Sequence, residues 1–107
     1  MMSLYAVIRE AGPGWGEGGI AAQEGVSDHA RFMNALAEDG PVLFAGPLAG
    51  TETGRLRVLL IMSAANEEQI RRSLLDDPWE STDRLVITSI EPWNLMVGAE
   101  RLAALTS

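Results

Sequence analysis

His29, Asp76 and Asp77 are the side chains of this sequence best suited to acid–base chemistry. His29 is the only histidine, and it falls in the first turn of a predicted helix, where a protonated imidazole would face the positive end of the helix dipole. Asp76 and Asp77 close a second predicted helix, where the dipole is negative. Each misplacement costs roughly 0.3–1 kcal/mol. Because positions that break local preferences are over-represented at functional sites, these residues are candidates for a catalytic centre.

Pairing between His29 and an aspartate would offset both penalties. An aspartate bonded to one ring nitrogen fixes the tautomer and leaves the other nitrogen free as a general base. The competing interpretation is structural, because a single histidine on a helix face often has only a satisfied hydrogen bond. Asp77-Pro78 at a helix end is equally typical of a simple turn. The choice stays open at this point, since only the fold can bring the two side chains together.

Other kinds of site have weaker signals. Gly14, Gly16 and Gly19 match a G-x-G-x-x-G spacing, but no helix follows directly and Glu17 would face the phosphates. Residues 12–19 are therefore predicted to form a mobile loop and not a dinucleotide site. One histidine and scattered carboxylates lack the spacing of metal ligands, and the sequence contains neither cysteine nor a G-x-S-x-G signature. We expect no cofactor and no metal.

Aromatic and basic residues supply candidate contacts for a substrate. Trp15, Phe32 and Trp79 are candidate substrate-binding walls of a pocket. For Trp15 the slightly favoured alternative is an anchor between the glycine-rich loop and the core, and for Phe32 simple core packing is at least as well supported. Arg9 or Arg55 could hold a substrate carboxylate, but we expect both to be solvated surface charges.

Hydrophobic periodicity predicts the helices that position these residues. A helix is predicted over residues 28–39, with Ser27 as its N-cap and Gly40-Pro41 as its stop. A second helix is predicted to begin in the capping-box-like stretch 66–69 and to end near Asp77, because Pro78 follows. The core-facing side of the first helix carries His29, Phe32, Met33, Leu36 and Ala37.

Strands are predicted over residues 4–9, 42–45, 55–63 and 85–90. We also expect a hairpin connection at 48–54, an extra edge strand at 94–97 and a short terminal helix at 100–105. The order of the main elements is β-α-β-β-α-β. This order predicts an α+β fold of the ferredoxin-like type, with an antiparallel sheet and two helices on one face.

The strand at 55–63 is apolar at every position from 58 to 62, so both of its faces need a cover. The helices can cover only one face, and a bare second face would be a large exposed apolar patch. A second copy of the same sheet would cover it most simply. We therefore expect a homodimer in which two sheets pack face to face.

Composition limits the partners. The chain has 107 residues, 47% of them hydrophobic, which suits one packed domain. Its net charge of −7 disfavours nucleic acids and anionic membrane surfaces. The longest apolar run is too short to span a bilayer, and the start of the sequence has no signal-peptide pattern. We expect a cytoplasmic protein whose further partner is a small molecule.

Several short segments in a fixed order resemble the YCII-related (YciI-like) family, whose members have a dimeric α+β-barrel fold. They span nearly all of the chain up to Gly98, so residues 1–98 are expected to form the family domain and residues 99–107 a C-terminal tail. The matching pieces are Tyr5 to Arg9, Asp28-His29-Ala30-Arg31-Phe32 with Leu36, Gly40, Ala45-Gly46-Pro47-Leu48, Asp77-Pro78-Trp79 and Ile90-Glu91-Pro92-Trp93.

This resemblance implies a ferredoxin-like subunit, a dimer, and a histidine–aspartate pair in a pocket between helices and sheet. Carried over by position, the pair is His29 and Asp77, whereas Asp76 has no counterpart. Members of the family are linked to lyase-type elimination, namely dehydrochlorination of a chlorinated hydroxyquinol, and the broader fold includes muconolactone isomerases and small monooxygenases. The glycine-rich stretch 12–19 is longer than the family pattern.

Two functions are compatible with these observations. The first is a cofactor-free enzyme, lyase-like or isomerase-like, in which His29 acts as general base on a small cyclic or aromatic substrate and Asp77 orients it. The second is a non-catalytic dimeric module that binds a small molecule or another protein.

Overall fold

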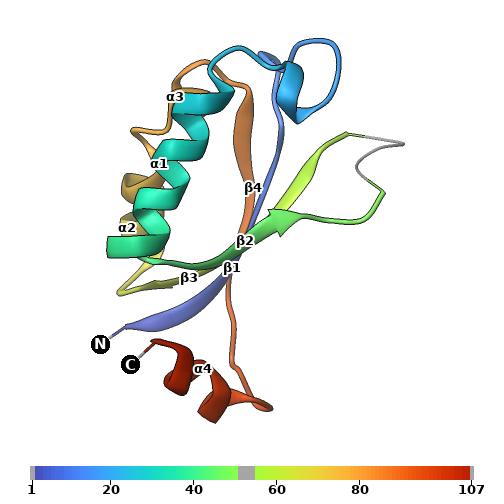
Figure 1. The fold of residues 1–107 in the computed structure, drawn as a ribbon. Helices are drawn as coiled ribbons and strands as arrows, with labels where there is room; N and C mark the ends of the chain where they lie inside the picture. The colour runs from blue at the N-terminus through green and yellow to red at the C-terminus, as the bar shows by residue number, and fades with distance from the viewer. Residues whose placement is uncertain (1, 51–54, 107) are drawn as a thin grey trace.

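The computed structural model describes residues 2–50 and 55–106, so part of the predicted hairpin connection, residues 51–54, lies outside the described residues. The strands form one antiparallel sheet in the order β2-β3-β1-β4, and α1, α2 and α3 lie on the same side of it (Figure 1). This arrangement confirms the ferredoxin-like α+β fold. The elements are β1 (Ser3–Ala11), the 3₁₀ turn η1 (Ile20–Ala22), α1 (Val26–Asp39), β2 (Val42–Pro47), β3 (Arg57–Ala64), α2 (Glu67–Leu74), α3 (Pro78–Ser81), β4 (Leu85–Pro92) and α4 (Ala99–Thr106).

The four predicted strands coincide with β1 to β4, and the terminal helix with α4. The extra edge strand predicted at 94–97 is wrong, because this segment has no strand conformation. The ladder between β1 and β4 runs out at Pro92 and at the bond from the Trp93 N–H to the Leu4 carbonyl, 2.9 Å. Beyond that point too little of β1 remains for a further strand to pair with. In the described part of the chain, no helix is long and apolar enough to cross a membrane.

The predicted start of α1 is wrong by two residues, and its N-cap is Gly25 and not Ser27. Gly25 has a positive φ of 80°, a backbone conformation that glycine adopts without a Cβ penalty. Its carbonyl accepts the His29 N–H at 2.9 Å and closes the first helical turn. The N-terminus of α2 is confirmed, since the Asn66 side chain accepts the Gln69 N–H at 2.9 Å.

The main core lies between the sheet and α2. Alternate residues of β1 and β3 face it, and Ile70 and Leu74 of α2 cover them. Met33 and Leu36 of α1 are only partly buried against this cluster, and Ala37 is exposed, so its predicted core-facing position is wrong. A second, smaller cluster surrounds Trp79 of α3, and its other buried members are Ala11, Leu56 and Leu85.

The opposite face of the sheet carries the other half of each strand. There Ile8 lies opposite Leu59, and Phe44 of β2 lies opposite Ile61. None of α1, α2 and α3 lies on this face (Figure 1). Phe44 is 51% exposed whereas Ile61 is 9% exposed, so part of this apolar face remains open to solvent.

Candidate active site

The fold brings His29 and Asp77 into direct contact. Nδ1 of His29 lies 2.9 Å from each carboxylate oxygen of Asp77. His29 comes from the first turn of α1, whereas Asp77 is the N-cap of α3 and accepts the Trp79 N–H at 2.9 Å. The Asp77 side chain is fully buried, and that of His29 is 17% exposed. Asp77-Pro78 is thus a helix start, and the same carboxylate also holds the imidazole.

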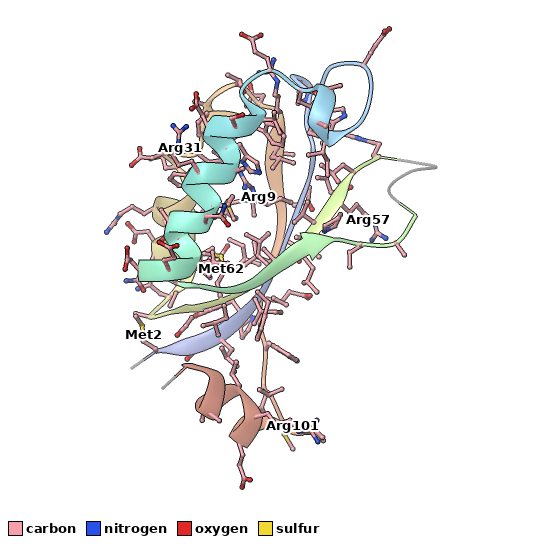
Figure 2. All side chains as sticks on the ribbon, in the orientation of Figure 1. Met2, Arg9, Arg31, Arg57, Met62 and Arg101 are labelled. Carbon is pink, nitrogen blue, oxygen red and sulfur yellow. The ribbon has the colours of Figure 1, made fainter. Side chains whose placement is uncertain are left out.

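Arg9 of β1 completes this group, and the expectation that it is a solvated surface charge is wrong. Its guanidinium is 1% exposed and donates to Asp77 Oδ2 and to Glu80 Oε2, each at 2.9 Å. Figure 2 shows its side chain on the side of the sheet that α1 covers, whereas Arg31 points away. The signal in the sequence was strand alternation, because Arg9 shares the inward face of β1 with Val7 and Ala11.

These contacts keep Asp77 ionised. Burial alone raises the pKa of the Asp77 carboxyl, but hydrogen bonds from His29 and from the Trp79 N–H, together with the charges of Arg9 and of a protonated His29, outweigh it. The pKa of Asp77 therefore lies below its ordinary value of 3.8. An ionised carboxylate only accepts hydrogen bonds, so Nδ1 of the imidazole carries the proton that it donates. The lone pair of the neutral ring is then on Nε2.

Trp79 fixes the plane of this imidazole. The two rings are stacked, with centroids 4.0 Å apart and an angle of 7° between their planes. Trp79 is itself held by its indole N–H, which donates to the Glu24 carbonyl at 2.9 Å, and is only 1% exposed. The arrangement gives His29 a defined orientation, and an aromatic face against a ring that becomes positive when it takes a proton.

A cavity of about 190 Å³ opens beside the pair. His29 and Met33 of α1, Ile20 of η1 and residues 45–47 of β2 line it, above a floor of sheet residues. Apart from Arg9, His29 and the indole N–H of Trp79, its lining residues have apolar side chains. A buried apolar space of roughly 150 Å³ holds benzene, so the size and lining of this cavity suit one small ring.

Of the three predicted substrate-binding residues, only Trp79 lines the cavity. Trp79 lines the cavity, whereas Trp15 does not and packs edge-on against Trp79, with ring centroids 5.5 Å apart. Phe32 is partly buried on α1 but is not among the lining residues. Asp76 is exposed beside Asp77. Arg55 is exposed as expected and donates to the Ala11 carbonyl.

The glycine-rich loop has fixed contacts at both of its ends. The Gly12 and Gly14 N–H groups donate to the carbonyls of Arg84 and Asp83 at 2.9 and 2.8 Å. A Cβ on Gly14 would lie 2.0 Å from the Thr82 carbonyl oxygen, so this close approach requires glycine. The far end closes around the side chain of Gln23, which sequence reasoning missed, because a single polar residue in a polar segment gives no signal.

Within residues 2–50 and 55–106, no three histidine, aspartate or glutamate side chains converge as metal ligands would. What the site offers is one oriented imidazole beside an apolar cavity. Such an arrangement can take a proton from a bound molecule and hold the resulting charge against a buried carboxylate.

Fold and site together define a ferredoxin-like α+β protein with a histidine–aspartate contact at the edge of an apolar cavity. No protein-family model and no curated protein matches its sequence. Among solved structures it is similar to 5-chloro-2-hydroxyhydroquinone dehydrochlorinase (TftG) from Burkholderia phenoliruptrix AC1100, in complex with 2,5-dihydroxybenzoquinone. The sequences are 17% identical, the TM-score is 0.58, and the match covers 91% of this chain and 97% of that one. The similarity shows a shared fold.

Proposed function

We propose that this protein is a cofactor-free enzyme, lyase-like or isomerase-like, in which His29 is the general base and Asp77 orients it. The contact between Nδ1 and the Asp77 carboxylate, 2.9 Å at each oxygen, is the observation that carries the proposal. It fixes the tautomer in which Nε2 is the basic nitrogen. The same imidazole lines a cavity, so a bound molecule has access to it.

The chemistry follows from this tautomer. Nε2 takes a proton from an acidic O–H or C–H of the bound ring, and the electron pair left behind moves into the ring. In an elimination that pair expels chloride, and the net loss is HCl. In an isomerisation the imidazolium returns the proton to another carbon atom. Asp77 and the Trp79 ring stabilise the imidazolium between these steps.

The substrate class proposed is a small cyclic or aromatic molecule. Support comes from the size of the cavity, about 190 Å³, and from the structurally similar protein, which is named as a dehydrochlorinase and was solved with a one-ring quinone. The short segments that resemble the YCII-related family include both His29 and Asp77. We therefore propose membership of that family as well.

We also propose that the protein works as a homodimer, with a second copy covering the open sheet face. The support is the partly open sheet face opposite α1, α2 and α3, where Phe44 of β2 is 51% exposed. An exposed apolar sheet of this kind is unusual in a monomer. Light scattering after gel filtration should give a dimer for the wild type and a monomer for Phe44→Glu. A wild type that stays monomeric at high concentration contradicts the assembly, and leaves the proposed chemistry standing.

The decisive experiment for the chemistry measures turnover in two separate variants, His29→Gln and Asp77→Asn. We expect each variant to lose about 10²–10⁴-fold in turnover, measured as chloride release from 5-chloro-2-hydroxyhydroquinone or as consumption of a cyclic substrate found by screening. Arg31→Gln, an exposed change on α1, is the control and should keep wild-type rates. Turnover that persists in His29→Gln removes the histidine from the mechanism. Ligand binding without turnover in the wild type favours a binding module.

A further inference from the structure

The segment between β1 and α1 contains a buried side chain that the proposed chemistry does not use. Gln23 is 4% exposed, although residues 16–22 around it are all exposed. Its Oε1 accepts the Gly16 N–H at 2.8 Å. Its Nε2 donates to the carbonyls of Gly16 and Gly19 at 3.1 and 3.2 Å, and lies 3.4 Å from two more carbonyl oxygens between them. The Gln23 side-chain amide therefore bridges the two ends of residues 16–19 through hydrogen bonds to their main chain.

Closing the loop this tightly needs glycine. Gly18 has a φ of 91°, and a Cβ there would lie 2.9 Å from the Ala22 side chain. The bonds to Gln23 replace the strand and helix bonds that this backbone lacks. The segment thus has one preferred shape, and it holds η1 directly after it in a fixed place.

That place is the edge of the cavity. Ile20, the first residue of η1, lines the cavity while remaining 38% exposed, so it lies between the cavity and solvent. Residues 45–47 of β2 also line it. On its other side the segment is anchored through Trp15, which packs on Trp79, the residue that stacks on His29. The loop and the base are therefore held against the same indole.

We propose that Ile20 forms the outer wall of the ligand site and limits ligands to a single ring, and that Gln23 positions Ile20 by holding residues 16–19. The proposal rests on the proposed function and refines its substrate class. A branched side chain at the edge of an apolar cavity excludes a larger ligand by overlap, and a change of one methylene in such a pocket alters discrimination about 10–200-fold. Gln23 touches no ligand and acts through the loop.

The test compares one-ring and two-ring probes. Dissociation constants for 2,5-dihydroxybenzoquinone and 2-hydroxy-1,4-naphthoquinone are measured by calorimetry for the wild type, Ile20→Ala and Gln23→Leu. Leu75→Ala, a change at a 63% exposed leucine that does not line the cavity, is the matched control. We expect the wild type and the control to prefer the one-ring probe by at least about 10-fold. Ile20→Ala should reduce that preference about 10-fold or more, through tighter binding of the two-ring probe.

Gln23→Leu should also reduce the preference, and should speed proteolytic cleavage within residues 16–19, while Ile20→Ala leaves cleavage unchanged. A wild type that binds both probes equally, or an Ile20→Ala variant with the wild-type ratio, overturns the role of Ile20. Wild-type cleavage and ratio in Gln23→Leu overturn the role of Gln23. The proposed function fails separately, through turnover that persists in His29→Gln, because neither variant touches the contact between His29 and Asp77.

Discussion

Replacing Arg9 by methionine tests how the site holds its buried charge. Arg9 and Asp77 are 1% and 0% exposed, and the bond between them is 2.9 Å long. Removing one partner of a buried ion pair costs about 3–5 kcal/mol, because the other charge is left without compensation. Asp77 keeps its bonds from His29 and from the Trp79 N–H, so we expect the lower end, about 3 kcal/mol at pH 7.

The loss of stability in Arg9→Met should depend on pH, because it depends on the charge of Asp77. The folded-state pKa of Asp77 is lowered, so its ionised form contributes stability that is complete above the ordinary value of 3.8 and is lost as the pH falls below it. The charge of Arg9 is one cause of the lowering, so Arg9→Met raises the pKa of Asp77. The difference in stability between wild type and variant should therefore shrink as the pH falls below 3.8, because Asp77 of the variant takes up a proton at a higher pH than Asp77 of the wild type.

The assay is urea unfolding at fixed protein concentration, followed at pH 7 and at pH 3. Arg71→Met is the control, because Arg71 and Glu67 form an exposed pair, 56% and 55% accessible, worth roughly 0.5 kcal/mol or less. A loss below about 1 kcal/mol for Arg9→Met at pH 7 would contradict the reasoning, since it falls short of the cost of breaking a buried pair. So would an equal loss at both pH values, because it would separate the effect from the Asp77 carboxylate.

Two further predictions concern local backbone structure. Gly14→Ala should destabilise the protein by about 1–3 kcal/mol, because the new Cβ would overlap the Thr82 carbonyl. Gly19→Ala is the control: the space around Gly19 is open, so stability should change by less than about 1 kcal/mol. Equal melting temperatures of the two variants would contradict this packing. Asn66→Ala should cost about 1 kcal/mol through loss of the cap on α2, with Glu68→Ala on the same helix as a control, and an unchanged denaturation midpoint would show that the cap contributes nothing.

Most of the fold could be predicted because local patterns and tertiary packing agree in it. The strand at 55–63 and the helix after Asn66 have the composition and caps that their observed elements need. The predicted element boundaries are wrong where a contact between residues far apart in the sequence determines the local structure. Gly25 caps α1 in place of Ser27, next to the bond from Trp79 to the Glu24 carbonyl, a partner 55 positions away. No local preference encodes such a partner.

The candidate site shows the same division. His29 and Asp77 were candidates because each opposes the dipole of its predicted helix, and the structure places them in contact. For Asp77 that premise is wrong, because α2 ends at Leu74 and not near Asp77, and Asp77 is instead the N-cap of α3, where the dipole favours a carboxylate. The prediction that Arg9 is exposed relied on its charge. The alternation of β1 instead places Arg9 on the buried face, together with Val7. The role of Gln23 could not be predicted from the sequence, because its side chain bonds to main-chain carbonyls that come together only when the loop closes.

The bond from the Trp79 indole to residue 24 uses a main-chain oxygen, while the Glu24 side chain is 91% exposed. Substitutions at this position therefore keep the contact between α3 and the start of α1, since every amino acid brings the same carbonyl. An inserted or deleted residue nearby would instead shift this contact, and would displace the imidazole relative to its carboxylate. Position 24 is thus free to vary in residue type, whereas the number of residues between it and α1 is not.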